Sequence, residues 1–489
     1  MVLSKTYIKR RSLVDFFGLI VSGCLLLLFT ICDFNLWFIL AATILISTWS
    51  LWSISNPLLA YGVIIFVWVN LFQRASIFIM PLEGYANRGS LYLGNIMLTV
   101  FLVSNFVKYL KSHKTVRIIK PSINTTIFLF PYLLFSILLP LLGILSGQWP
   151  LSYAATAIRN MQWILITVVA YFLCNKYSSS AVIRMTFKVL LFSCFMEVSY
   201  SVLQMVYVYV FPAQYPYLDK VFMETHPYDW LTFGRATGLT VNPNSLGLQG
   251  LVFMSLFFSL LLSGNYVNAW LPVFLGLASV WLIVSSGSRT AILTLFALLS
   301  SVAFIDVVKR EKLSLLRRIG LVAATILTSG AVAWALVSNM SDLLETRLYS
   351  AFVIPFQGFL SDPSFGMRVE TWQAAFAYLY EHPFGSLVPP SYALQRAVDS
   401  YWVNVIVQGS AIYLLMFILF IAAVITLGVR SINNIEPMTR CAGYFLVLVV
   451  LVALVGGISM ATFQDSIVII LLYEFIGITI YNESKTIRR

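Results

Sequence analysis

The 489-residue chain is too apolar for a soluble protein, because 60% of its residues are hydrophobic and only 10% are charged, against about 25% charged residues in a typical soluble domain. In a soluble protein the formal net charge of +12 would suggest a nucleic-acid partner. Here the basic residues stand in short runs between apolar stretches, which is typical of cytoplasmic loops. We therefore expect an all-α polytopic integral membrane protein, with no nucleic acid as a partner.

Apolar stretches long enough to cross a membrane recur along the chain. A spanning helix needs about 20 mostly apolar residues, and about fourteen such helices are predicted. They lie at residues 15–32, 35–54, 58–73, 91–107, 124–143, 158–174, 188–210, 244–263, 269–285, 290–307, 319–338, 401–428, 441–459 and 465–481. One helix over 15–54 would be ~60 Å long, about twice the hydrocarbon thickness. We therefore expect a turn at Cys32–Asn35 and, by the same reasoning, another near Gln464 and Asp465.

The basic residues orient these helices. With the N-terminus in the cytoplasm, roughly 70% of the 31 Lys and Arg residues fall in cytoplasmic segments, as the positive-inside rule requires. We expect a plasma (inner) membrane protein with both termini in the cytoplasm. The predicted regions are N-terminal helices (1–210), an external loop (211–243), helices that carry arginine motifs (244–338), a large external loop (339–400) and C-terminal helices with a cytoplasmic tail (401–489).

Two external segments have patterns of their own. Residues 74–90 are too rich in charge to span and are expected to form a loop or an interfacial piece. In the large external loop, apolar residues recur at helical spacing. They are Val369, Trp372, Phe376 and Leu379. We expect a short amphipathic helix there, which lies on the outer membrane surface or caps the bundle.

Three predicted helices begin at the outer surface with unusually polar segments, Gly234–Ser245, Ser285–Thr290 and Arg396–Ser400. A helix N-terminus presents unpaired N–H groups and a positive dipole end, which suit a phosphate. Arginine adds bidentate donors that match phosphate oxygens. Because Arg235 and Arg289 fall on this face together, a phosphate site is predicted. The alternative is that the Asn, Ser and Asp residues are ordinary caps and the arginines reach lipid headgroups.

The remaining polar residues allow more than one interpretation. Glu197 and Glu474 fall in the middle of predicted spans, where we expect them to be hydrogen-bonded inside the bundle; a proton path is the alternative. His382 stands at a predicted helix end, where it can cap the last carbonyls. The five cysteines lie in or beside apolar stretches and lack metal-ligand spacing, so we expect no metal site.

Taken in order, these motifs resemble the O-antigen ligase and Wzy-type polymerase superfamily of bacterial surface polysaccharide enzymes. The matching residues are Arg235, Gly238 and Asn242–Asn244; Ser286–Arg289; Arg368, Trp372 and the turn His382–Gly385; and Asp399, Tyr401 and Gly409. The resemblance covers about residues 230–420. It implies a membrane glycosyltransferase that takes glycan from an undecaprenyl pyrophosphate carrier on the outer face without a metal or other cofactor. Membrane lipids are then partners, and a chain-length regulator is a candidate partner.

The resemblance also implies roles for individual residues. Arg235 and Arg289 would hold the pyrophosphate. We expect further substrate contacts from Asn242, Asn244, Ser288, Arg368, His382, Arg396 and Arg159. Ligases of this superfamily carry a His-(Asn/Ser/Gln) pair where this chain has Val398 and Asp399. We therefore prefer a polymerase that uses Asp399 as general base or acceptor-orienting group, although Asp399 as a plain helix cap stays open.

Two other functions stay open. A ligase would move finished glycan onto a lipid or protein acceptor. A transporter, such as a polysaccharide flippase, would need charged residues along a path through the midplane. The charges of this sequence gather at the outer face instead, which counts against transport.

Overall fold

The computed structural model describes residues 57–70, 76–80, 89–92, 98, 101, 123–148, 154–210, 235–240, 242–264, 270–309, 363–387, 390–394, 398–460 and 462–486. The long helices are α3 (Pro57–Asn70), α5 (Ile123–Leu145), α6 (Ala154–Tyr177), α7 (Ser179–Val210), α9 (Pro243–Ser263), α10 (Trp270–Ser286), α11 (Arg289–Lys309), α15 (Pro363–Glu381), α17 (Tyr401–Ile432), α18 (Pro437–Gly456) and α19 (Ser466–Thr486). Short helical turns are η3 (Gly238–Thr240), α16 (Pro390–Ala393) and η5 (Thr462–Gln464).

Ten of the predicted spans contain a described helix, whereas the first two residues of the span predicted at 91–107 belong to a strand, Gly89–Tyr92. Seven described helices, α5, α6, α7, α9, α17, α18 and α19, are long and apolar enough to cross a membrane, and α3, α10 and α11 are shorter apolar helices. A multi-pass helical membrane protein is thus confirmed. The spans at 15–32, 35–54 and 319–338, and most of 91–107, lie outside the described residues. The total of about fourteen therefore stays a prediction.

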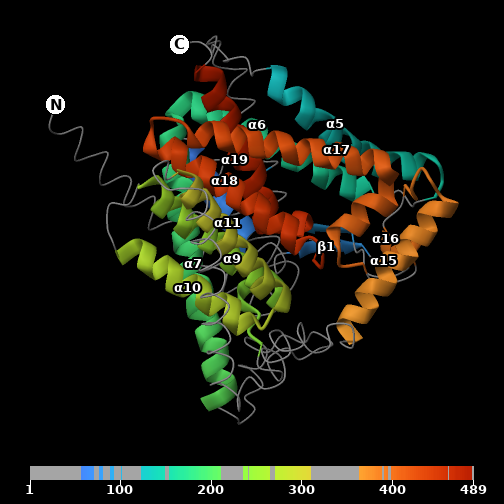
Figure 1. The fold of residues 1–489 in the computed structure, drawn as a ribbon, viewed down its shortest axis with the longest axis horizontal. Helices are drawn as coiled ribbons and strands as arrows, with labels where there is room; N and C mark the ends of the chain where they lie inside the picture. The colour runs from blue at the N-terminus through green and yellow to red at the C-terminus, as the bar shows by residue number, and fades with distance from the viewer. Residues whose placement is uncertain are drawn as a thin grey trace.

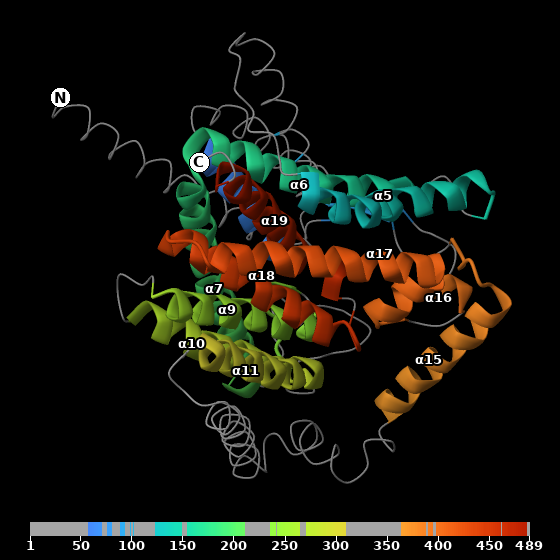
Figure 2. The same cartoon turned by 45° about the horizontal axis from the view of Figure 1, so that its top comes forward.

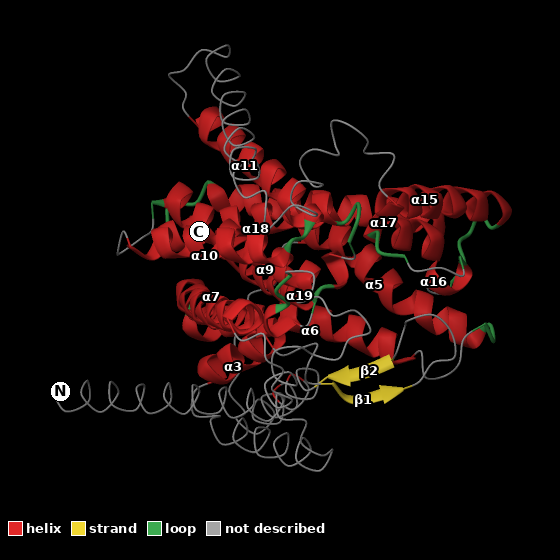
Figure 3. Ribbon diagram, turned by 90° about the horizontal axis from the view of Figure 1, so that it is seen from below, coloured by secondary structure: helices red, strands yellow, loops and turns green. Residues whose placement is uncertain are grey.

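One described segment departs from the all-α expectation. Strands β1 (Ser76–Met80) and β2 (Gly89–Tyr92) form an antiparallel hairpin (Figure 3), which begins in the segment 74–90, predicted to be a loop or an interfacial piece, and extends into the first two residues of the helix predicted at 91–107. The sequence of β1, Ser-Ile-Phe-Ile-Met, is rich in the β-branched and aromatic residues that favour strands. At five residues, β1 is also far shorter than a membrane-spanning helix requires.

Among the seven helices long enough to cross a membrane, α9, α18 and α19 are the best buried. Helix α9 packs on α10 and α18, α17 packs on α5 and α18, and α6 packs on α19 (Figures 1 and 2). Small residues allow the close approaches: a Cβ atom on Gly443 of α18 would lie only 2.6 Å from the carbonyl oxygen of Gly428 on α17. Membrane helices commonly pack through such positions, because dispersion contacts drive their association.

Helix α17 is broken near its start. Gly409 (φ −134°, ψ 16°) and Ser410 (φ 64°, ψ −166°) leave helical geometry, so a short first segment precedes the long one. The break frees a carbonyl group: the oxygen of Val407 accepts a hydrogen bond of 2.8 Å from Ser386 N. The turn that follows α15 is thereby docked onto α17, and α15 and α16 lie beside the start of α17 at one end of the bundle (Figures 1 and 2).

The same end of the bundle carries most of the predicted site. Helices α9, α11, α17 and α19 begin there, and α10 and α18 end there. We call this the polar end and define it as residues 235–240, 242–245, 285–290, 398–401, 456–460 and 462–466. Helix α19 runs away from it and ends at the opposite end (Figure 2).

Candidate functional site

Arg235 joins the two arginine motifs at the polar end. Its Nε donates a hydrogen bond of 2.8 Å to the carbonyl oxygen of Ser286, and its Nη2 donates one of 3.0 Å to Asn244 Oδ1. The next residue, Ala236, donates its N–H to the carbonyl oxygen of Ser285 at 2.8 Å. The side chain of Arg235 is 6% exposed. The guanidinium is therefore held in one orientation between the start of α9 and the end of α10.

The turn between α10 and α11 is shaped to receive this arginine. Gly287 has φ 56°, and a Cβ atom there would lie 3.2 Å from Arg235 Cγ. Ser288 then caps α11, since its Oγ accepts a hydrogen bond of 3.3 Å from Ala291 N. Arg289, half-buried, is the first residue of α11. The two arginine motifs thus meet where Arg235 contacts the turn that leads into α11.

The start of α9 follows its sequence signals. Asn242 is the N-cap, its Oδ1 accepts a hydrogen bond of 2.8 Å from Asn244 N, and Pro243 occupies the first turn. Capping is therefore a demonstrated role of Asn242. Asn244 uses its side-chain oxygen to hold Arg235, so the two asparagines have different structural tasks.

Both mid-span carboxylates are hydrogen-bonded inside the bundle, as predicted. Glu197 on α7 accepts the N–H of Leu239 at 2.9 Å. Glu474 on α19 accepts the hydroxyl of Thr186 on α7. Both glutamate side chains are fully buried. Glu197 therefore contacts the loop that carries Arg235, whereas the bond of Glu474 joins two spanning helices.

Further hydrogen bonds tie the start of α17 to the same end. Thr290 Oγ1 and Ser459 Oγ are 2.7 Å apart, which joins the start of α11 to the loop after α18. Ser400 donates its hydroxyl to the carbonyl oxygen of Gly457 at 3.2 Å and is the N-cap of α17. Asp399 precedes it and is exposed. The alternative in which Asp399 itself caps α17 is therefore wrong.

The amphipathic helix predicted in the large loop exists as α15. Ala375 is 1% exposed and packs with Val403 and Val407 of α17, with Trp372 half-buried beside them. Phe376, which belongs to the predicted apolar stripe, is 58% exposed. The face of α15 that contacts α17 is therefore centred on Ala375, and an exposed Phe376 is compatible with a helix that lies on the membrane surface.

The functional residues predicted on and after α15 lie near its two ends. Arg368 is half-buried in the first turns. His382 is exposed, its N–H donates to the carbonyl oxygen of Tyr378 at 2.8 Å, and its ring lies 4.4 Å from the Tyr378 ring. Both residues thus belong to the segment that packs on the start of α17.

The hydrogen bonds at the polar end do not test two of the predicted substrate contacts. Arg159 lies on α6, where its guanidinium stands 5.6 Å from the ring centroid of Trp163 in a cation–π contact. Arg396 lies outside the described residues. Their proposed contacts with substrate stay predictions.

Asp465, which was predicted only to mark a break between helices, is a further carboxylate of the polar end. Its Oδ2 accepts the hydroxyl of Ser245 at 2.8 Å and its Oδ1 accepts Ile467 N at 3.2 Å. Burial raises the pKa of this carboxyl to about 6, although the two hydrogen bonds act in the opposite direction. An aspartate immediately before a helix is a typical N-cap signal, and that signal was available.

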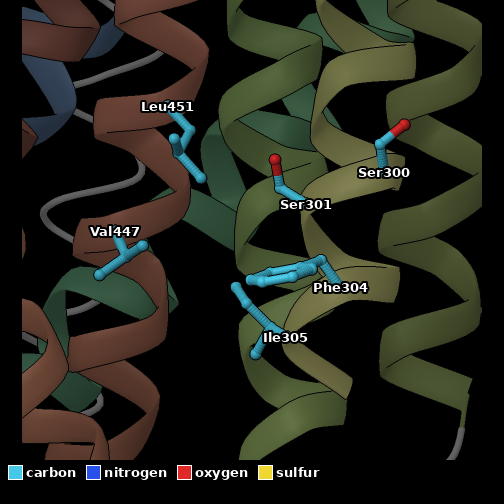
Figure 4. A pocket seen from close by; sticks show the side chains of 6 residues that line it. All are labelled: Ser300, Ser301, Phe304, Ile305, Val447 and Leu451. Atoms are coloured by element: carbon cyan, nitrogen blue, oxygen red, sulfur yellow. The ribbon is translucent and has the colours of Figure 1, made fainter. Parts of the chain in front are cut away.

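Within the described part of the chain, no group of three His, Cys, Asp or Glu side chains is arranged to hold a metal ion. An apolar groove between α11 and α18 (Figure 4) is formed by Ser300, Ser301, Phe304, Ile305, Val447 and Leu451. It lies more than ten residues along α11 from Arg289, so it is separate from the polar end.

The architecture and this site define a polytopic helical membrane protein with arginines collected where several helices begin. Residues 273–403 match the family model of the O-antigen ligase. The match runs from α10 into the first turn of α17 and includes Ser288, Arg289, His382 and Asp399, whereas Arg235 precedes it. The predicted resemblance to the O-antigen ligase and polymerase superfamily is thereby confirmed. No curated protein matches the chain.

Proposed function

We propose that this protein is a membrane glycosyltransferase that polymerises a bacterial surface polysaccharide, such as an O-antigen or exopolysaccharide. It transfers the growing glycan from an undecaprenyl pyrophosphate carrier to the next lipid-linked repeat unit, on the outer face of the plasma membrane. The observation that carries the proposal is the contact between Arg235 and the Ser286–Arg289 turn. The match to the O-antigen ligase family supports the same reaction class.

The contact suits the chemistry of a departing lipid pyrophosphate. Negative charge grows on the pyrophosphate as its bond to the sugar breaks, and fixed donors stabilise such charge without having to reorganise. Arg235 is already fixed by two hydrogen bonds, and the start of α11 adds N–H groups and the positive end of a helix dipole. Arg289 adds a second guanidinium at the same helix start.

The acceptor hydroxyl needs a group that orients it and takes its proton. Asp399 is our candidate, because it is exposed beside the start of α17 and follows the position where ligases of the superfamily carry histidine. Asp465 is a second candidate, because it lies next to α9, within the same polar end as Arg235. Both carboxylates are near the helix starts that we assign to the pyrophosphate.

A ligase is the runner-up, favoured by the description of the matching family. Such an enzyme would use the same arginines to hold the carrier pyrophosphate but would deliver finished glycan to a different acceptor. The two functions differ in the product: a polymerase changes the length of the glycan on the carrier, whereas a ligase changes what the finished glycan is attached to. Val398 at the position of the ligase histidine supports the polymerase.

The test uses Arg235→Ala and Arg289→Ala in cells that depend on this protein. The polymerase proposal predicts short or absent surface polymer and an accumulation of single-repeat lipid-linked units. Arg430→Ala is the matched control, because Arg430 pairs with Glu483 far from the polar end. Normal polymer length in both arginine variants would refute the proposal. Long polymer that stays on the carrier would indicate the ligase, and unflipped units on the cytoplasmic side would indicate transport.

A further inference from the structure

The loop that carries Arg235 lies inside the helix bundle. Residues 235–240, which include the turn η3, are all buried. Backbone N–H groups that are buried in protein cannot rely on water, so an irregular segment persists there only where protein groups accept its hydrogen bonds. The partners of this backbone therefore decide where the arginine is held.

Two side chains of α7 supply those partners. Gln204 Oε1 accepts the N–H groups of Thr237 at 3.2 Å and Gly238 at 2.9 Å. Glu197 Oε2 accepts the N–H of Leu239 at 2.9 Å. The two acceptors are two helical turns apart, which places them on one face of α7. Three consecutive N–H groups of the loop are thus bound by one face of one helix.

A glycine brings the loop close to the carboxylate. Gly238 has φ 61°, a conformation that residues with a Cβ atom seldom adopt. A Cβ atom on it would lie 2.5 Å from Glu197 Oε2 and 2.6 Å from Leu246 Cδ1. The position of the loop along α7 is therefore fixed by backbone geometry as well as by hydrogen bonds.

We infer that Glu197 and Gln204 are positioning residues for Arg235. They hold the loop from the α7 side, while the turn between α10 and α11 holds Arg235 itself from the other side. This assignment rests on the proposed function, because it describes how the pyrophosphate-binding arginine is kept in place. It gives the buried Glu197 a role other than a proton path through the membrane.

The first test measures amide hydrogen exchange in the purified full-length protein. Glu197→Leu removes the acceptor of Leu239, so exchange at that amide should rise about tenfold or more. Glu197→Gln keeps a side-chain oxygen and should stay near wild type. Glu474→Leu is the control, because it removes an equally buried carboxylate that does not contact the loop. Unchanged exchange at residues 237–239 in Glu197→Leu would overturn the inference.

The second test measures binding of undecaprenyl pyrophosphate to the same variants. Glu197→Leu should weaken binding about as much as Arg235→Ala does, and the double variant should be no weaker than Arg235→Ala, because the two residues act in series. Wild-type affinity in Glu197→Leu, or losses that multiply in the double variant, would overturn the inference. If the wild type does not bind this lipid, the proposed function fails, and the exchange measurement still decides whether α7 holds the loop.

Discussion

At the scale of single residues, Asp465 shows how a charged group can be kept at the edge of an apolar bundle. It lies between α9 and α19, where Ser245 and the backbone of Ile467 donate hydrogen bonds to it. Those bonds favour the carboxylate form, but removal from water favours the neutral form more strongly, and the pKa is raised to about 6. The pKa of an aspartate in an unfolded chain is ~3.9.

The direction of this pKa shift gives a prediction about stability. Because the folded pKa lies above the unfolded one, ionisation of Asp465 destabilises the fold; the effect is absent well below about pH 4 and complete above about pH 6. Asp465→Asn removes the charge and keeps an acceptor for Ser245. It should raise the apparent Tm of the purified protein at about pH 7.5, and by less at about pH 5.

The control for this measurement is Asp399→Asn, which neutralises an exposed carboxylate at the same end of the bundle. It should leave the apparent Tm unchanged at both pH values. An equal Tm difference between wild type and Asp465→Asn across the pH range would show that ionisation of Asp465 does not affect stability.

At the scale of elements, the broken start of α17 binds the turn that follows α15 and so holds α15 at one end of the bundle. The carbonyl oxygens of Val407 and Gln408 accept the N–H groups of Ser386 and Leu387, at 2.8 and 3.1 Å. Gly385 makes this docking possible: its φ is 83°, and a Cβ atom there would lie 2.7 Å from Gln408 O. The carbonyl groups freed by the break in α17 thus bind the turn that follows α15.

Gly385→Ala should therefore undock the turn. Both the positive φ and the contact with Gln408 oppose a side chain, and we expect a cost of about 2 kcal/mol or more. Limited proteolysis of the purified protein should cut the segment that carries α15 faster, and surface polymer should shorten. Gly366→Ala is the matched control, since a Cβ atom on this α15 glycine meets open space. Equal proteolysis of the two variants would contradict this account.

Some features of the elements were predictable from local sequence and others were not. The start of α9 carries its own signals, a capping asparagine followed by proline, and it begins where they predict. The helix α15 was also predicted from its spacing, but the face that contacts α17 was not. That face is chosen by Val403 and Val407, which lie in another helix, so periodicity within α15 could not reveal it.

At the scale of the whole molecule, counting the predicted helices was enough to predict that the arginine motifs lie on one face. An even number of spans between two motifs places them on one face, which is why Arg235 and Arg289 could be expected together. The contacts that fix the site could not be expected in this way. Glu197 and Leu239 are 42 residues apart, and Ser245 and Asp465 are 220 residues apart. Such pairs depend on how the helices pack against one another.

The orientation of the bundle gives a further prediction. Phe384 at the end of α15 is 79% exposed, and Ile435 between α17 and α18, at the other end, is 94% exposed. In intact cells a membrane-impermeant thiol reagent should label Phe384→Cys and should reach Ile435→Cys only after the membrane is opened. Of the five native cysteines, Cys174, Cys194 and Cys441 are buried, whereas Cys24 and Cys32 lie outside the described residues. Labelling of the unmodified protein is therefore measured in parallel as the background. Labelling of Ile435→Cys in intact cells would reverse the orientation and remove the site from the outer face.

The most direct test of the central claim is a binding titration of undecaprenyl pyrophosphate against the purified protein. We predict that Arg235→Ala and Arg289→Ala each weaken binding at least about tenfold, since each removes a charge-assisted interaction with phosphate, and that Arg430→Ala binds like wild type. Undecaprenol, which lacks the phosphates, should bind the wild type and both polar-end variants equally weakly. Equal affinity of all four proteins for the pyrophosphate lipid would contradict the claim that these arginines gather to hold it.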